Sequence, residues 1–86
     1  MARYFFDFIA PVLSTYDGEG ADCADMNSVS EKALSALCEI ASDHPQRYVG
    51  QGIRISVRNE ANQIVLTAAL HLSLDCAASA NQTEAA

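Results

Sequence analysis

The feature that most restricts the fold is a pair of alternating segments in the carboxyl-terminal half of the chain. In residues 53–58 the apolar side chains fall strictly at odd positions, and in residues 64–74 the larger apolar ones fall mainly at even positions. A period of two is typical of a half-buried β-strand, because successive side chains of a strand point to opposite faces of a sheet. Residues 59–63, four of them polar, separate the segments. The pattern predicts an antiparallel hairpin.

The opposite parity of the two segments also restricts their register. Inward odd residues of the first strand must face inward even residues of the second, or one apolar set would turn to solvent. A connection without a bulge then holds two or four residues, and Val57 lies opposite Ile64 or Leu66. Asn62, in the turn, tolerates a left-handed backbone at low cost.

Residues 3–9 predict a further strand that carries apolar side chains on both faces. Ala10 and Pro11 end it, and residues 12–16 are a candidate second short strand. The acidic, glycine-containing stretch that follows is expected to be a loop. The strand has one face with Tyr4, Phe6 and Phe8 and another with Phe5, Asp7 and Ile9.

One amphipathic helix is predicted between the strands. Asp25, Asn27 and Ser28 are all competent to cap a start at residues 26–28. Pro45 disfavours the helical conformation of the residue before it, so the helix should end near Asp43. Placing residues at about 100° each gives an apolar face made of Met26, Ser30, Ala33, Leu34, Leu37, Ile40 and Ala41.

Together these elements predict an α+β fold of two layers, in the order β-β-α-β-β. An antiparallel sheet of three to four strands would pack one face on the single helix. Residues 1–76 would form one domain, and residues 77–86 a disordered tail without periodic pattern. The expected inner layer consists of Phe6, Leu34, Leu37, Ile40, Ile55, Val57, Leu66, Leu70 and Leu72.

Charge and cysteine content narrow the class of protein. Five Lys and Arg against eleven Asp and Glu give a formal net charge of −6, which repels nucleic acid and anionic membrane surfaces. No stretch has the length of a membrane span or the pattern of a signal peptide. Cys23, Cys38 and Cys76 form no CxxC pair and are odd in number, so they predict reduced thiols. We therefore expect a cytoplasmic protein.

Several motifs in the first half of the chain resemble a known family. The opening Arg3, Tyr4, Phe5, Phe6, Asp7 resembles its usual R-[YF]-[FY]-F-D. The loop Asp17, Glu19, Gly20, Asp22, Asp25 resembles its D-x-E-G-x-[ED]-x-x-D.

With the Ala- and Leu-rich helix and the final hairpin, the likeness spans about residues 2–74. The family consists of small bacterial proteins catalogued as a domain of unknown function, so the resemblance implies no activity. Ala10 and Pro11 stand where the family usually has an Asp-Gly turn. The resemblance therefore does not decide whether the short second strand forms. Asn62 stands where a Gly is usual.

Two groups of residues are candidate sites. The face of the sheet away from the helix would carry a carboxylate, two guanidiniums and an imidazole, which suit a contact surface, a small-anion site or acid–base chemistry. The acidic loop supplies carboxylates for a hard cation, although its spacing is not that of an EF-hand. The candidates on the sheet face are Phe5, Asp7, Arg54, Arg58, Val65, Thr67 and His71, and those in the loop are Asp17, Glu19, Asp22 and Asp25.

The sequence favours a module that is not an enzyme. No zinc-ligand spacing, nucleophile elbow or phosphate-binding glycine motif is present, so no catalytic residue, metal or cofactor is expected. The preferred hypothesis is a protein-interaction or self-association module, a homodimer or a subunit with a protein partner, that acts through the open sheet face. The alternative is a small anionic-ligand-binding domain or modest enzyme that uses Asp7, Arg54, Arg58 and His71.

Overall fold

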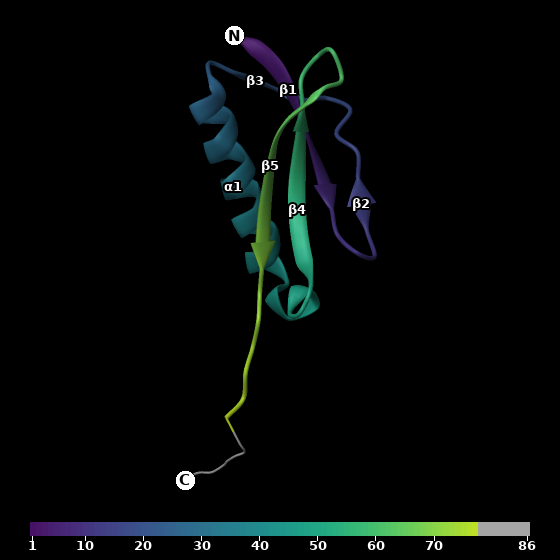
Figure 1. The fold of residues 1–86 in the computed structure, drawn as a ribbon, viewed down its shortest axis with the longest axis vertical. Helices are drawn as coiled ribbons and strands as arrows, with labels where there is room; N and C mark the ends of the chain where they lie inside the picture. Colours follow the sequence, from purple (N-terminus) through teal and green to yellow (C-terminus); the bar gives the residue numbers. More distant parts are fainter. Residues whose placement is uncertain (78–86) are drawn as a thin grey trace.

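The computed structural model describes residues 1–77 and consists of one antiparallel sheet with one helix on one of its faces (Figure 1). This arrangement confirms the predicted α+β class. Of the predicted tail, residues 78–86 lie outside the described part of the chain. The elements are β1 Ala2–Ile9, β2 Ser14–Thr15, β3 Ala21–Cys23, α1 Met26–Asp43, the 3₁₀-helix η1 Pro45–Tyr48, β4 Gly52–Arg58 and β5 Ile64–His71.

The sheet has five strands rather than three to four. Its main order is β2-β1-β4-β5, and β3 also pairs with β1. The second short strand exists, but it is only two residues long. Ala21 and Asp22, which belong to the predicted loop, instead form β3 together with Cys23, and Tyr4 lies opposite Ala21. A three-residue strand has too few side chains to show a period of two, so its pairing is invisible in the sequence.

The predicted hairpin is β4 and β5. Val57 lies opposite Leu66, one of the two partners expected for it. A register shift follows between Val57 and Arg58, where Ile64 is the next partner, so the five-residue connection needs a bulge. Asn62 has the left-handed conformation, with φ 65°. β5 ends at His71, short of residue 74.

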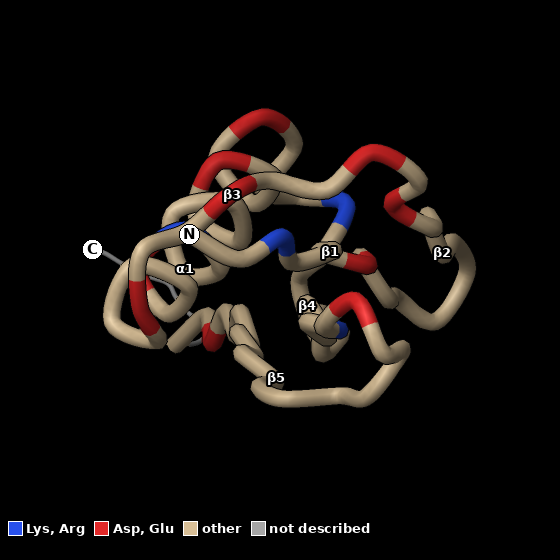
Figure 2. Tube along the Cα trace, turned by 90° about the horizontal axis from the view of Figure 1, so that it is seen from above, with Lys and Arg blue, Asp and Glu red and all other residues tan. Residues whose placement is uncertain are grey.

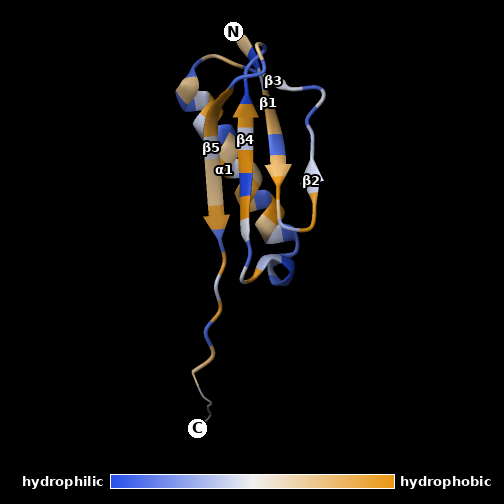
Figure 3. Ribbon diagram, turned by 45° about the vertical axis from the view of Figure 1, so that its right-hand side comes forward, coloured by the Kyte–Doolittle hydropathy of each residue, from blue (hydrophilic) through white to orange (hydrophobic). Residues whose placement is uncertain are grey.

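The core lies between β1, β4 and α1. Ile53, Ile55 and Val57 of β4 are at most 2% exposed, as their alternation predicts. Colouring by hydropathy shows that alternation along β4 (Figure 3). Phe8 of β1 meets Tyr48 edge to face, with ring centroids 6.3 Å apart. Tyr48 belongs to η1, a short helix that the sequence pattern does not predict. Pro45, which ends α1, is also the first residue of η1.

The helix has the predicted bounds, and its buried face agrees in part with the predicted one, since Ala33, Leu37 and Ala41 are buried and Ile40 packs against the core. Asp25 caps the helix by accepting a hydrogen bond from the Ser28 amide, 2.8 Å. Leu34 was expected in the core and is 53% exposed, so that expectation is wrong. The residues that α1 buries lie four apart, which is one row along a helix surface. They are Val29, Ala33, Leu37 and Ala41.

Candidate functional site

The pairing of β1, β4 and β5 places the sheet-face candidates on the side away from α1. Phe5 lies opposite Arg58, and Gly52 of β4 lies opposite His71. Asp7 lies opposite Ser56, two residues before Arg58, so Asp7 and Arg58 are diagonal neighbours within side-chain reach.

Asp7 and Arg58 form a two-point ion pair. Nε of Arg58 donates to Oδ2 of Asp7 over 2.7 Å, and Nη2 donates to Oδ1 over 3.1 Å. Only 15% of the Asp7 side chain and 12% of the Arg58 side chain are exposed. A forked, charge-assisted pair of this kind is stronger and more specific in geometry than a solvated surface pair. These two candidates therefore do not belong to a solvated face.

The remaining surface of the Arg58 guanidinium is also occupied. Nη1 donates to the Asn62 side-chain oxygen, 3.0 Å, and Nη2 donates to the Asp17 carbonyl, 2.9 Å. The guanidinium carbon lies 4.2 Å from the centroid of the Tyr16 ring and 4.9 Å from that of the Phe5 ring, both within cation–π range. Arg58 thus ties β1, β4, the β4–β5 turn and the loop after β2 together, and it offers little to a ligand.

Asp17 bridges the interruption between β2 and β3. These strands flank the two ends of β1, and Asp17 lies in the stretch of chain between them. One of its carboxylate oxygens accepts from the Phe6 amide of β1, 3.0 Å, and the other accepts from the amides of Glu19 and Gly20. The side chain thus supplies an acceptor where strand pairing is interrupted. The Asp17 amide in turn donates to Asp7, 2.9 Å.

Both carboxylates are held in the ionised state. The hydrogen bond from Arg58, with that from the Asp17 amide, lowers the pKa of Asp7 against the opposing effect of burial. Burial favours the neutral form of Asp17, but hydrogen bonds from three backbone amides and the Arg58 charge outweigh it and lower its pKa. Hydrogen bonds made to the charged form have this direction of effect.

The acidic loop places its four carboxylates in different positions. Asp17 contacts β1, and Asp25 caps α1. Asp22 lies 3.4 Å from Arg3, whose Nη1 also donates to the Glu19 carbonyl. Within residues 1–77 no three His, Cys, Asp or Glu residues are grouped closely enough to hold a metal ion.

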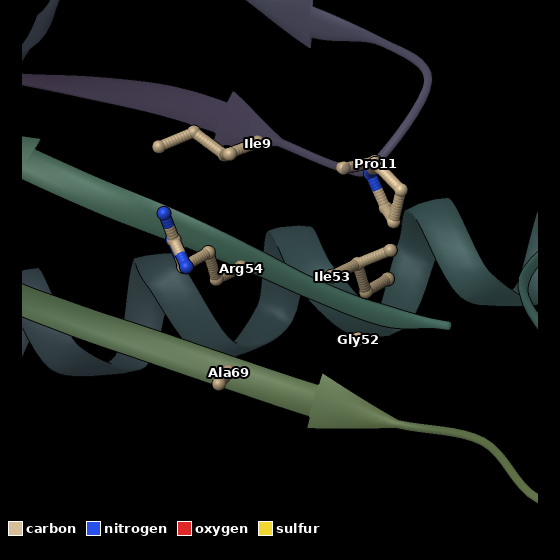
Figure 4. Close-up of a pocket in the computed structure, with 7 residues that line it drawn as sticks. Ile9, Pro11, Gly52, Ile53, Arg54 and Ala69 are labelled. Atoms are coloured by element: carbon tan, nitrogen blue, oxygen red, sulfur yellow. The ribbon is translucent and has the colours of Figure 1, made fainter. Parts of the chain in front are cut away.

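Arg54 and His71 remain exposed on the β5 side of this face. No carboxylate of the described residues forms an ion pair with Arg54. Arg54 borders a shallow hollow of about 320 Å³ whose other walls come from the end of β1, the start of β4 and β5 (Figure 4). The hollow is lined by Ile9, Ala10, Pro11, Gly52, Ile53, Arg54 and Ala69.

Strand β5, which carries Val65, is a free edge of the sheet. Within the described part of the chain it pairs with β4 alone. Its eight residues, IVLTAALH, include no proline, lysine, arginine or carboxylate, and the strand bears no charge colour when the molecule is seen from above (Figure 2).

Neither the β5 edge nor the contacts that Asp17 makes between β2 and β3 are marked by a familiar sequence motif. However, Asp side chains often accept hydrogen bonds from backbone amides two or three residues further along the chain. This turn pattern would have suggested the contacts of Asp17 with the Glu19 and Gly20 amides, but not its contact with β1.

Among the described residues, neither α1 nor η1 has the length and apolar character of a membrane-spanning helix. The search of curated proteins and the search of solved structures both gave no match. One family model matches, over residues 3–71. The matched region contains the β1 opening and the loop motif, whose side chains and backbone make the contacts just described. The chain therefore belongs to the family described as a domain of unknown function (DUF6894).

Proposed function

We propose that this chain is a protein-interaction module without enzymatic activity and that its contact surface is centred on β5. The single observation that supports this proposal is the free edge: eight residues without charge or proline next to unpaired backbone groups. Edge strands in monomeric proteins are usually short, charged or covered, because unpaired N–H and C=O groups attract further strands. An edge that lacks these protections is suited to strand addition by a partner.

The other half of the open face supports the same location. Around Arg58 the side chains bind one another, and Ser56 beneath them is 7% exposed, so this half has little free polar surface. On the β5 half, Val65, Thr67 and Ala69 are all exposed, next to the charged Arg54. A small apolar surface bordered by a cation is a common composition for an interface.

A photo-crosslinking contrast tests this proposal. A benzophenone amino acid is placed at Val65 on β5 or at Glu39, an exposed position of α1, and the full-length chain is irradiated in the cells that make it. We expect protein adducts from position 65 and none from position 39. Equal adducts from both positions, or no adduct from position 65, would contradict the proposal. A cytoplasmic location stays part of it, and the free thiols of Cys23, Cys38 and Cys76 are compatible with a reducing compartment.

A second candidate function is the binding of a small carboxylic acid at Arg54. The observation that favours it is the hollow beside Arg54, which combines one guanidinium with an apolar lining. Of the four residues that the sequence predicts for an anion site, Asp7 and Arg58 neutralise each other, which leaves Arg54 and His71. Linear carboxylates of three to six carbons should raise the melting temperature of the native chain and not that of an Arg54→Gln variant. No shift with any of these acids would exclude this candidate.

A further inference from the structure

The free edge has a defined pattern of unpaired backbone groups. The Phe6 amide of β1 points away from β4, because it donates to Asp17. In an antiparallel sheet the hydrogen-bonding direction alternates from residue to residue. The odd residues of β1 therefore bond to β4, through the even residues of β4, and the odd residues of β4 bond to the even residues of β5. The Leu72 carbonyl, which accepts from Gly50 on that same side, agrees with this assignment.

It follows that Thr67, Ala69 and His71 direct their amides and carbonyls away from the sheet. These three residues lie beyond the bulge, where the register of β5 is regular. Their side chains are on the open face and are exposed. Each can donate one hydrogen bond and accept another from a neighbouring strand. Nothing within residues 1–77 takes up these bonds.

We infer that the partner of this edge is a second copy of the chain, paired antiparallel through β5 about a two-fold axis. The inference rests on the proposed function and names its partner. A two-fold axis perpendicular to the sheet keeps both helices on one face, and it requires odd residues to pair with odd residues. The outward backbone groups of β5 are those of odd residues. The registers that the two-fold axis allows are therefore also those in which these groups can bond to one another. The register that uses all three places Ala69 opposite Ala69 and Thr67 opposite His71.

The helix side of the edge is also suited to a second copy. Leu34 of α1 and Leu66 of β5 border a hollow of about 190 Å³ that is lined by Ser30, Leu34, Leu66, Thr67 and Ala68 and opens beside β5. In this register Leu72 and Leu70 of the second copy lie opposite Leu66 and Ala68, so the neighbour brings two apolar side chains to the edge of the hollow. Leu34 is 53% exposed in the single chain. The pairing therefore adds apolar surface beside Leu34, which α1 does not bury against its own sheet.

Charge does not oppose self-association through this edge. Two copies with a net charge of −6 each repel one another over most orientations. β5 contains no carboxylate, so its approach to a second β5 brings no negative charges together. The result is a continuous sheet in the order β2-β1-β4-β5-β5-β4-β1-β2.

Three variants test the inference in the full-length chain. Sedimentation equilibrium should give twice the chain mass of 9.2 kDa for the native protein and the single mass for Ala69→Pro. Proline at position 69 removes only an outward amide, whereas the matched Ala68→Pro removes a bond within the β4–β5 ladder and should unfold the chain. Should Ala69→Pro also unfold, Thr67→Lys supplies the test, because a lysine on an edge strand disfavours the addition of a further strand, and a folded monomer is expected. A native monomer at micromolar concentration, or a dimer that survives Thr67→Lys, would overturn the inference.

A disulfide reports the register. In a background with Cys38→Ser and Cys76→Ser, Ala69→Cys should be cross-linked between chains by mild oxidation, because Cα atoms of opposed, hydrogen-bonded residues lie about 5.5 Å apart, within disulfide range. Glu39→Cys in the same background should form no cross-link between chains. A dimer in which position 69 does not cross-link overturns the pairing. A monomer whose position 65 still captures another protein overturns this inference and leaves the proposed function standing.

Discussion

Arg58 of β4 and Asp7 of β1 face one another diagonally across the sheet, and two hydrogen bonds of 2.7 and 3.1 Å join them. The Asp17 amide donates to the same carboxylate. Asp7 therefore connects two strands and a loop that are distant in sequence.

Replacing Asp7 by Asn should weaken the fold at neutral pH and reduce its sensitivity to acid. Asparagine offers one oxygen where three donors converge, so we expect a loss of about 1–3 kcal/mol in the free energy of unfolding at pH 7. The pKa of Asp7 is lowered in the folded chain from its ordinary 3.8. Its stabilisation is therefore complete above about pH 5 and is lost as pH falls through 3.8 towards the folded pKa. Urea titrations at pH 7 and pH 3 measure both effects.

The control for this prediction is Asp22→Asn, since the Asp22 side chain is 52% exposed and its ion pair with Arg3 is long, at 3.4 Å. Exposed pairs contribute about 0–1 kcal/mol. The difference between native and Asp7→Asn stabilities should shrink at pH 3. If the two free energies of unfolding differed by the same amount at pH 7 and pH 3, ionisation of Asp7 would not contribute to stability.

Arginine at position 58 should not be replaceable by lysine, whereas arginine at position 54 should be. Both lie on the open face of β4, four residues apart. Lysine keeps the charge but cannot supply a planar fork or stack between two rings. We expect Arg58→Lys to lower the melting temperature by about 4 °C or more, and Arg54→Lys to leave it within about 2 °C. Equal effects in thermal unfolding at pH 7 would contradict the structural role given to Arg58.

The hairpin and the helix bounds could be predicted because their signals are local and repeated. β4 alternates without exception over residues 53–58, and Pro45 ends α1 through the conformation of its own neighbour. The helix face could be predicted only in part. A sector of about 60° on either side of Leu37 includes Leu34 and leaves out Val29, whereas in the structure Val29 is buried and Leu34 is 53% exposed.

The sequence predicts which residues share the open face, but not which of them contact one another. Alternation alone places Asp7, Arg54 and Arg58 on one face, but not which arginine meets the carboxylate. That choice depends on the register between β1 and β4, two strands that are separated in sequence by the helix. Asp17 and Tyr16 complete the cluster from a loop whose path has no periodic signal. Long-range pairing is therefore the information that the sequence pattern lacks.

Truncation of two helix leucines should distinguish the buried row from the exposed one. Leu37 is 1% exposed and Leu34 is 53% exposed. Leu37→Ala should cost about 2–5 kcal/mol of unfolding free energy through lost burial and a residual cavity. Leu34→Ala should stay within about 0.5 kcal/mol in a monomer. Chemical denaturation of both variants in the Thr67→Lys background keeps association from contributing, and the reverse order of the two losses would refute the helix orientation.

Gly20 should be irreplaceable by alanine, and Gly18, two residues earlier in the same loop, should not. Gly20 has φ +76°, and a Cβ there would lie 2.8 Å from the Tyr4 carbonyl oxygen and 2.9 Å from the Phe5 ring. Nothing lies within 4 Å of a Cβ at Gly18, which lacks the left-handed conformation. A left-handed alanine costs about 1–2 kcal/mol, and the contact with backbone adds about 1–3 kcal/mol.

The displaced group in Gly20→Ala would include the Gly20 amide, which donates to Asp17 over 3.0 Å. The loss should therefore spread to the Asp17 bridge and expose the Phe6 amide that it accepts from. Hydrogen exchange of that amide, measured in a folded sample below the melting temperature, should accelerate at least tenfold in Gly20→Ala and remain unchanged in Gly18→Ala. Loss of stability without faster exchange at Phe6 would mean that the strain stays local to the Tyr4 contact.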